Sequence, residues 1–317
     1  MTVTINQNEP TILKGLAASP GIAIGPVYIH RKFEPVINET KLETPEIEAE
    51  IDRLKDAIAR SYRELSKILE FARTKLGDDQ AKILEAQTLI LQDNILLSTL
   101  YRRVKKEHRN AESIVYEEIG KYYHVMLAAK DEYTRERAQD VEDVRHRILR
   151  NLQEKKLTSR LENACIIVAH SLTPADTLIF SRNDVLGYAS DVGGITSHTA
   201  ILSRALKIPA VVGLHELAIK LQPKDQLILC GYSGTIIVNP TPQQIADYRE
   251  KLRRHQAFEA NLVNITDLPA ETLDGHRVTI QANVELTSEL DFVKSQGADG
   301  IGLFRSEVLL FGREDFP

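Results

Sequence analysis

The sequence is poor in the residues and segments that mark several classes of protein. Among its 317 residues are no tryptophan and only two methionines and two cysteines, and the formal net charge is −5. No apolar run is long enough for a membrane-spanning helix, and the amino-terminal residues lack the basic and apolar segments of a signal peptide. A mildly acidic chain is also not expected to bind nucleic acid. We therefore expect a cytoplasmic protein with no membrane span.

The two cysteines stand in apolar surroundings. Cys165 and Cys230 each belong to a short apolar run of the kind that forms a buried strand. This placement predicts reduced, structural thiols. A disulfide or a catalytic thiolate is the alternative, but no basic side chain next to either cysteine favours it.

Glycine and proline are nearly absent between residues 44 and 160, which favours long uninterrupted helices. Thr44 is expected to cap the first helix and Pro45 to occupy its first position. Apolar side chains then recur every three or four residues to about Leu76. Three further helices are predicted over residues 79–92, 94–108 and 111–153. We interpret residues 44–160 as an inserted helical bundle.

On both sides of this insertion the pattern changes to short apolar runs. Residues 11–30 predict two strands with tight turns, and later runs predict five more strands, at residues 164–169, 185–187, 209–212, 226–230 and 235–238. Residues 1–43 and 161–242 are therefore expected to form one α/β domain. A charged linker helix is predicted within residues 243–265. Residues 266–317 then predict a strand at 277–284, a helix at 288–296 and a strand at 300–304, the start of a parallel α/β array.

One histidine stands in an unusual local sequence, Gly-Gly-Ile-Thr-Ser-His-Thr-Ala over residues 193–200. The glycines allow a sharp turn and a close approach to a ligand. Thr196 or Ser197 is expected to cap a helix that begins near His198. Backbone N–H groups at a helix start bind phosphate well, and imidazole can act as a nucleophile. The alternative is a structural histidine, as most of the nine histidines should be.

This segment resembles the phosphohistidine segment of enzyme I of the bacterial phosphoenolpyruvate-dependent sugar phosphotransferase system. The similarity continues through Arg204 and the Ile-Pro-Ala-Val-Val-Gly run at 208–213, and it recurs at residues 18–23, 172–176, 238–241 and 300–307. The resemblance implies an α/β phosphohistidine (swivelling) domain with an inserted helical bundle, followed by the first strands of a truncated (β/α)8 barrel. Since a complete barrel needs about 200 residues, the barrel in this chain is expected to be incomplete.

The resemblance also implies roles for single residues. His198 matches the phosphorylated histidine, Thr173 the threonine that orients its ring, and Arg305 an arginine that binds the phosphate of phosphoenolpyruvate. Further substrate contacts are expected from Gly194, Thr196, Ser197 and Arg204. For Thr173 the alternative is a turn residue before a proline, and for Arg204 a solvated charge on a helix.

The implied reaction transfers the phosphoryl group of phosphoenolpyruvate, through His198, to the histidine of a small phosphocarrier protein, the first step of sugar uptake. The resemblance further implies Mg²⁺ as cofactor and a homodimer formed through the barrel. The metal ligands are expected beyond Pro317 and none within the chain. We therefore expect this chain to accept a phosphoryl group from the phosphorylated carrier and to be inactive with phosphoenolpyruvate alone.

The inserted bundle is implied as the docking site of the phosphocarrier. Its second helix is acidic near both ends, at Asp78, Asp79, Glu85 and Asp93, which would suit a basic partner. The same helix has more apolar residues than one core stripe needs, at Ile83, Leu84, Leu89, Ile90 and Leu91. One or two of these are expected to be exposed.

Two other functions fit parts of the sequence. The first is the phosphohistidine domain of a pyruvate phosphate dikinase or phosphoenolpyruvate synthase relative. Those enzymes place a large ATP-binding region before this domain, and the chain shows no phosphate-binding glycine loop of the Walker type. The second is a binding module for the phosphocarrier that has no site for the phosphoryl donor.

Overall fold

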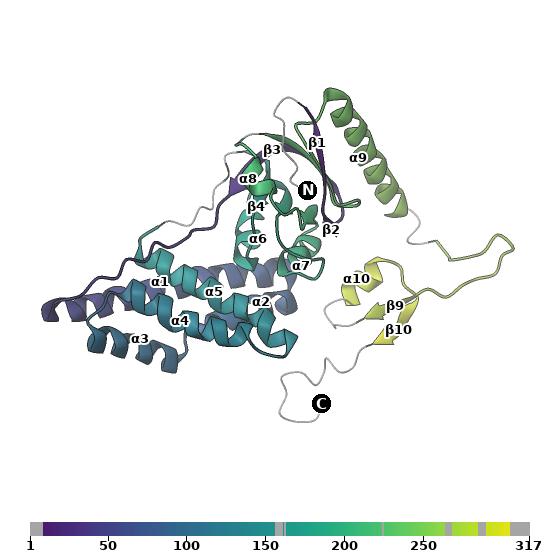
Figure 1. Ribbon diagram of the computed structural model, residues 1–317. Helices are drawn as coiled ribbons and strands as arrows, with labels where there is room; N and C mark the ends of the chain where they lie inside the picture. The colour runs from purple at the N-terminus through teal and green to yellow at the C-terminus, as the bar shows by residue number, and fades with distance from the viewer. Residues whose placement is uncertain are drawn as a thin grey trace. The chain divides into compact units, whose positions relative to one another are not determined.

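A computed structural model describes residues 9–155, 161, 163–223, 225–263, 268–284 and 290–304 (Figure 1). The chain divides into two compact units, Met1–Ile245 and Ala246–Pro317, and each is described by itself. Within the described residues, no helix combines the length and the apolar character needed to cross a bilayer.

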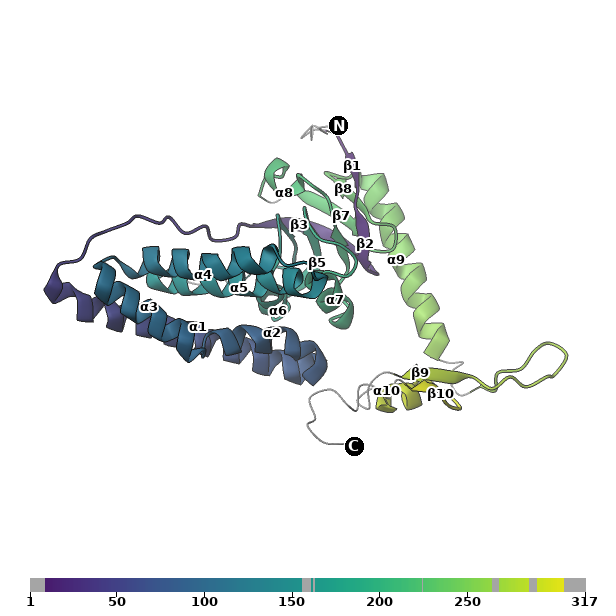
Figure 2. The ribbon, with the colours of Figure 1, turned by 60° about the horizontal axis from the view of Figure 1, so that its bottom comes forward.

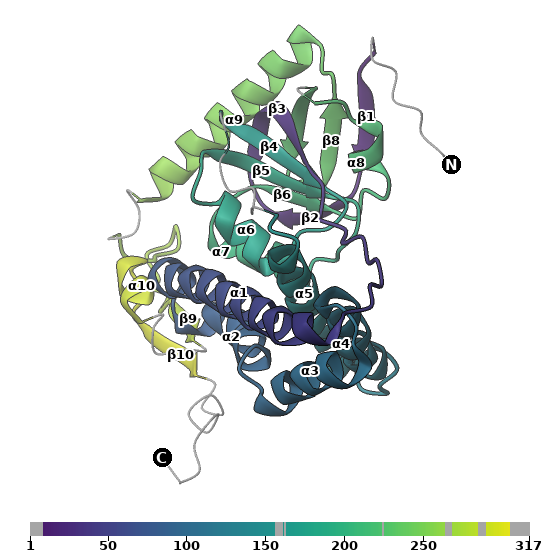
Figure 3. The same cartoon turned by 90° about the vertical axis from the view of Figure 1, so that its left-hand side faces the viewer.

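The first unit contains one eight-stranded sheet, in the order β1-β8-β7-β3-β4-β5-β6-β2 (Figure 3). The strands are β1 (Thr11–Lys14), β2 (Leu16–Ser19), β3 (Ile22–His30), β4 (Cys165–Ala169), β5 (Val185–Ser190), β6 (Ala210–Val212), β7 (Gln226–Cys230) and β8 (Thr235–Val238). Strands β3 to β6 are parallel, and the other pairs are antiparallel. The two parts of the chain that flank the inserted helices therefore share one sheet, as expected for the α/β domain.

Residues 11–30 form three strands, so the prediction of two was wrong. Gly15 separates β1 from β2, and a Cβ atom there would lie 2.6 Å from the carbonyl oxygen of Val212. Pro26 lies inside β3 and not in one of the tight turns expected within residues 11–30. Pro26 ends the pairing of β3 with β7, and Val27 begins the pairing with β4. A strand can accept a proline, which has no N–H group, at such a change of partner.

The inserted segment consists of helices that pack side by side (Figure 2). They are η1 (Thr44–Glu46), α1 (Ile47–Leu76), α2 (Asp78–Ile90), α3 (Asn94–Glu107), α4 (Ala111–Leu127) and α5 (Glu132–Leu152). The apolar positions of α1 that recur at three- and four-residue steps, such as Leu54 and Leu65, are fully buried. Gly77, with φ of +87°, ends α1 in a backbone conformation that favours glycine.

Two predictions about these helices were wrong. The helix expected over residues 111–153 is two helices, because Asp131 caps α5 by accepting the N–H of Thr134 at 2.7 Å. No glycine or proline marks this break, and the guanidinium of Arg135 holds it by donating to the carbonyl oxygens of residues 129 and 130. Thr44 lies inside η1, and the residue before it, Glu43, donates its N–H to the side chain of Glu46 at 2.8 Å.

Helices α6 (Pro174–Phe180) and α7 (His198–Ala205) connect the sheet to the bundle (Figure 3). Leu178 and Leu202 belong to the apolar core of the bundle, whereas Phe180 and Ala200 pack into a core formed with the sheet. Each helix therefore buries side chains in both cores. A short helix, α8 (Leu217–Lys220), covers another part of the sheet.

Both cysteines are buried and free, in β4 and β7. Burial raises the pKa of the Cys165 thiol above its ordinary value. A raised thiol pKa disfavours the reactive thiolate. The structure thus agrees with the prediction of structural thiols.

The remaining elements are one long helix and a small βαβ segment. Helix α9 (Pro242–Val263) begins one residue before the range predicted for the linker helix and ends inside it. In the second unit, β9 (Gln281–Val284) and β10 (Gly300–Phe304) are parallel neighbours, with α10 (Leu290–Ser295) between them in the sequence. The strand expected over residues 277–284 is shorter than predicted. That this segment begins a (β/α)8 barrel stays a prediction.

Candidate active site

The turn before His198 has the geometry that its glycine and serine allow. Gly193 has φ of +123°, a conformation that L side chains rarely adopt. The N–H of Ser197 donates to the carbonyl oxygen of Gly194 at 3.1 Å, and its Oγ accepts the N–H of Ala200 at 3.4 Å. Of the two expected caps, Ser197 is therefore the one observed. His198 is the first residue of α7, where backbone N–H groups have no partner within the helix.

A second loop is held against this turn. The hydroxyl of Thr199 donates to the carbonyl oxygen of Leu172 at 3.0 Å. The next residue, Thr173, caps α6, because its Oγ1 accepts the N–H of Asp176 at 3.0 Å and its N–H donates to Asp176 Oδ2 at 3.1 Å. Among the described residues no hydrogen bond joins Thr173 to His198. The orienting role of Thr173 therefore stays a prediction.

Asp176 also fixes the end of β3. Its Oδ2 atom lies 3.8 Å from Nε2 of His30, the last residue of that strand. Burial alone would raise the pKa of Asp176, but the interactions with His30 and Thr173 outweigh it and hold the pKa below its ordinary value. The ionised carboxylate therefore joins the end of β3 to the start of α6.

His198 opens into a cavity of about 280 Å³. Its lining combines the two loops with residues from the β3 exit and from α5, namely Lys32, Gln139, Asp143, Ser171, Leu172, Thr173, Pro174, Val192, Gly193, Ser197, His198 and Thr199. The structure thus brings the predicted residues His198, Thr173 and Ser197 together. It also adds Lys32, Gln139 and Asp143, which the sequence analysis missed.

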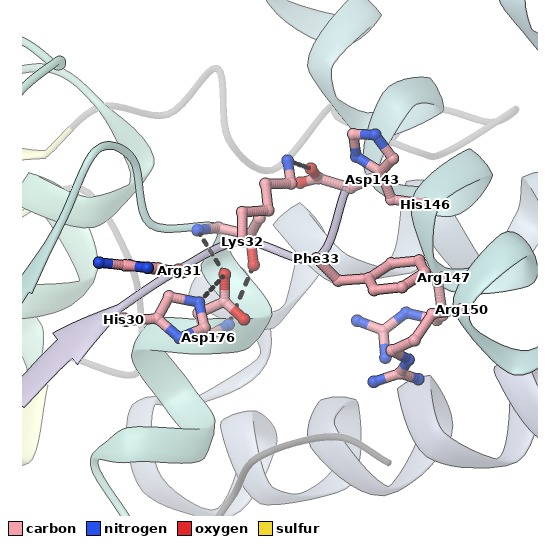
Figure 4. A pocket seen from close by; sticks show the side chains of 10 residues that line it. His30, Arg31, Lys32, Phe33, Asp143, His146, Arg147, Arg150 and Asp176 are labelled. Carbon is pink, nitrogen blue, oxygen red and sulfur yellow. Dashed lines mark hydrogen bonds and ion pairs between the residues drawn. The ribbon is translucent and has the colours of Figure 1, made fainter. Parts of the chain in front are cut away.

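Lys32 and Asp143 form an ion pair in this lining. Lys32 Nζ lies 3.0 Å from Asp143 Oδ1 (Figure 4). Gln139 Nε2 donates to the same oxygen at 3.0 Å. The Asp143 side chain is only 5% exposed, and burial raises its pKa even though Lys32 and Gln139 act in the opposite direction. Within the part of the chain that the structure describes, Asp143 Oδ2 has no hydrogen-bond partner.

A smaller cavity of about 120 Å³ adjoins the same ion pair. Figure 4 shows Phe33 in this cavity, with its ring directed toward Arg147 and Arg150. Both guanidinium groups are held by the carboxylate of Glu64 in α1. The sequence contains a signal for this polar lining. Charged residues recur in α5 at helical steps of three or four residues, at Asp140, Asp143, Arg147 and Arg150.

The other predicted contacts lie elsewhere. Thr196 and Arg204 line a different cavity, of about 550 Å³, and Gly194 is open, since a Cβ atom there would meet nothing within 4 Å. Arg204 is not simply a solvated charge: it donates to the carbonyl oxygens of Ala18 at 2.7 Å and of Ile195 at 3.0 Å. It thereby ties the His198 turn to β2. Arg305 lies outside the described residues.

The described residues offer no evident metal centre. No three histidine, cysteine, aspartate or glutamate side chains among them are grouped so that they could hold a metal ion.

The second helix of the bundle exposes one of its apolar residues. Leu84 and Leu91 are buried and Ile90 is partly buried, whereas Leu89 is 66% exposed. Ile95, at the start of α3, is 74% exposed. The side chains of Asp78, Asp79 and Ile83 lie outside the described residues. The expectation of one or two exposed apolar residues is thus met by Leu89.

Three family patterns match successive parts of the chain. Residues 14–137 match the family described as "PEP-utilising enzyme, N-terminal". Residues 161–234 match the "mobile domain" of PEP-utilising enzymes, which is the part that contains His198, and residues 259–317 match their "PEP-binding domain".

Curated relatives agree with these matches. The chain is 37% identical over 308 residues to the phosphoenolpyruvate-protein phosphotransferase of Listeria monocytogenes, covering 96% of this chain and 53% of the relative. It is 37% identical over 311 residues to the protein of the same name from Geobacillus stearothermophilus, covering 98% of this chain and 53% of the relative. The chain thus spans about half the length of the curated relatives it matches.

Solved structures extend the comparison to the fold. An NMR solution structure of enzyme I is 39% identical, with a TM-score of 0.67, and the match covers 77% of this chain and 99% of that one. The N-terminal domain of a nitrogen-type enzyme I is 26% identical, with a TM-score of 0.54, over 76% of this chain and 99% of that one. Because this chain covers 99% of the enzyme I structure to which it is 39% identical, it belongs to the enzyme I family of PEP-utilising enzymes.

Proposed function

We propose that this chain carries a phosphoryl group on His198 and exchanges it with the histidine of a small phosphocarrier protein, as the relay step between phosphoenolpyruvate and that carrier. One observation carries the proposal. His198 begins α7 in a cavity lined from both the α/β domain and the bundle, in a chain whose relatives are named phosphoenolpyruvate-protein phosphotransferase.

The chemistry requires a free lone pair on the imidazole. A neutral ring has one protonated nitrogen and one that can attack phosphorus. Attack on phosphoenolpyruvate forms a P–N bond and breaks the P–O bond, and the enolate that leaves takes up a proton to become pyruvate. The carrier's histidine then attacks the same phosphorus and the P–N bond of His198 breaks. Thr173 is the group proposed to hold the ring in the orientation that exposes the attacking nitrogen.

The turn supplies stabilisation for the bound phosphoryl group. That group brings about −1.5 to −2 charges. The N-terminus of α7 stabilises a nearby anion by roughly 0.3–1 kcal/mol. The backbone around Gly194, Thr196 and Ser197 is the proposed source of hydrogen bonds. Arg204 acts indirectly here, because its bonds to Ala18 and Ile195 hold the turn in place.

Other parts of the implied reaction rest on the family resemblance. Arg305 is proposed to bind the phosphate of phosphoenolpyruvate. When bound, Mg²⁺ would neutralise charge on phosphoenolpyruvate, and its ligands are proposed to lie outside the described residues. The homodimer and the cytoplasmic location stay predictions.

The inserted bundle is the proposed docking surface for the carrier. The exposed side chain of Leu89 and the half-exposed carboxylate of Glu85 lie on α2. An apolar residue next to acidic ones would suit a partner with an apolar centre and a basic rim. We expect Leu89→Asp to weaken carrier binding in an NMR titration, whereas an unchanged titration would contradict this location of the surface.

The test of the proposal is transfer from a radiolabelled phosphocarrier to the chain. The intact protein should acquire an acid-labile, base-stable label. His198→Ala should acquire none, while His276→Ala, which removes another exposed imidazole, should be labelled like the intact protein. Label retained in a folded His198→Ala variant would contradict the assignment. An intact chain that binds the carrier but takes no label would instead support the binding-module alternative.

A further inference from the structure

The cavity in front of His198 contains one positive and one negative side chain. Of the residues that line it, Lys32 and Asp143 are the charged ones, and His198 is the third that can titrate. Lys32 follows the last residue of β3 by two positions, and that strand end is anchored by the contact between His30 and Asp176. The ammonium group is therefore attached to a fixed part of the backbone and reaches the cavity through a flexible stem.

The ammonium group of Lys32 has more N–H donors than its contact with Asp143 uses. An ammonium group has three N–H donors, and the one hydrogen bond found for Lys32 in the described part of the chain goes to Asp143 Oδ1. The Lys32 side chain is 27% exposed, so it is partly removed from water. Two donors therefore remain for a ligand that enters the cavity.

Phosphorylation of His198 would make the net charge of this cavity more negative. The phosphoryl group adds about −1.5 to −2 charges to a lining that already contains Asp143. Two anions confined in a partly buried space repel each other strongly unless a cation lies between or beside them. Lys32 is the cation that the described lining provides.

We propose that the ammonium group of Lys32 binds the phosphoryl group carried by His198, so that Lys32 and the start of α7 together form the phosphoryl-binding subsite of this cavity. The inference deepens the proposed function and rests on it. In the unphosphorylated chain Asp143 holds Lys32 in the lining. In the phosphorylated chain Lys32 keeps that contact and directs its remaining donors to the phosphoryl oxygens.

The experiment is a ³¹P NMR titration of the phosphorylated chain, loaded either by the phosphorylated carrier or by phosphoramidate. A cation in contact with the phosphoryl group favours its dianion. The midpoint of its last ionisation should therefore rise by roughly one pH unit in Lys32→Met. Lys32→Arg, which keeps the charge, should restore the original midpoint. Resonances from other histidines are identified with His198→Ala.

Lys220→Met is the matched control. Lys220, the last residue of α8, is similarly buried, at 22% exposure, and lies 2.7 Å from the carboxylate of Glu216, the residue before that helix. This pair has no residue in the lining of the His198 cavity. Its loss should leave the ³¹P midpoint unchanged, whereas an equal rise would show that the titration does not report on the subsite and would overturn the inference.

Asp143→Asn distinguishes two possible roles of Lys32, which are direct binding of the phosphoryl group and neutralisation of the Asp143 carboxylate. If Lys32 binds the phosphoryl group, Lys32→Met should still raise the midpoint when Asp143 is already replaced. If Lys32 merely neutralises Asp143, the second substitution will have no effect, and the inference is wrong. A loaded chain with an unmoved midpoint contradicts the inference alone. A chain in which His198 accepts phosphate from neither donor contradicts the proposed function as well.

Discussion

The sheet and the inserted bundle are stabilised in different ways. Strands β4, β6 and β8 are buried along their whole length, and few ion pairs are found among the described residues of the α/β half. The bundle has an apolar core and, in addition, networks of ion pairs. Arg53, for example, lies 2.7 Å from carboxylate oxygens of both Glu50 and Glu112. The sheet is thus stabilised mainly by the burial of apolar side chains, whereas the stability of the bundle depends partly on charge.

This difference bears on the site. The turn at His198 is fixed by backbone geometry, a serine cap and the donors of Arg204. The opposite part of the lining comes from the bundle and the β3 exit, and it consists of charged and amide side chains such as Lys32 and Asp143. His198, the proposed nucleophile, therefore belongs to the α/β half, and the charged residues of the lining belong to the bundle and the β3 exit.

The largest expected effect is in the sheet. Ile167 lies in the central strand β4 and is fully buried. Ile167→Ala should lower the free energy of unfolding by about 4 kcal/mol, through lost burial and a cavity. Urea denaturation measures the loss. The same truncation at the exposed Ile12, in β1, should lower the free energy of unfolding far less. Equal losses at the two positions would show that burial of apolar side chains does not stabilise the sheet.

In the bundle, the corresponding effect should come from a charge. Glu64 holds the buried guanidinium groups of Arg147 and Arg150. Glu64→Gln would leave two buried cations without an anion, and we expect a loss of about 3 kcal/mol in unfolding free energy. Asp52→Asn is the control, because it breaks the exposed pair with Lys55. A loss no larger than that of the control would show that charge does not stabilise this part of the bundle.

A smaller effect is expected at the glycines before His198. Gly193→Ala forces a β-carbon into a residue with φ of +123°, although no atom would clash with it, and should cost about 2 kcal/mol from backbone strain. Gly194→Ala should leave stability unchanged, because its Cβ meets nothing within 4 Å. It should instead slow phosphorylation if the backbone there approaches the phosphoryl group. Thermal unfolding and label transfer, measured on both variants, test this contrast.

The smallest effect depends on pH. The hydrogen bond from Arg109, with help from Arg103 and against the effect of burial, lowers the pKa of Glu117 to about 2. A lowered folded-state pKa gives stability that is present above the ordinary value of about 4.5 and is lost as pH falls toward 2. Glu117→Gln should therefore cost about 1 kcal/mol at pH 7.

The same substitution should cost much less near pH 2, where the native carboxyl group is about half protonated. Urea denaturation at several pH values gives this difference directly. Glu48→Gln, which removes the carboxylate of an exposed pair with Lys105, is the control substitution. A cost for Glu117→Gln that persists unchanged at pH 2 would show that the side chain stabilises the bundle by contacts other than charge.

The sequence predicted best those features that depend on local pattern. The periodic apolar residues of α1 and the short apolar runs of β4, β7 and β8 were correctly placed. Ser197 was one of two expected caps, because a serine before a helix start satisfies a local backbone group. The break before α5 was missed, since an aspartate cap without glycine or proline is a weak signal beside a continuous helical pattern.

The site was predicted in part, for a physical reason. His198 and Thr173 stand in motifs that can be recognised one at a time. Lys32 and Asp143 are 111 residues apart in the sequence, and their contact at 3.0 Å depends on how β3 leaves the sheet toward α5. Such a pairing is a property of the folded chain, and no local pattern contains it. The helical spacing of charges in α5 indicated an inward polar stripe but not its partner.

The central claim is that His198 alone carries the phosphoryl group. The most direct measurement is a long-range ¹H–¹⁵N correlation spectrum of the imidazole rings before and after incubation with the phosphorylated carrier. The account predicts that the ring signals of one histidine shift, with coupling to phosphorus, and that these signals are absent in His198→Ala. Phosphorus coupling at any other of the nine histidines, with the His198 ring unchanged, would contradict it.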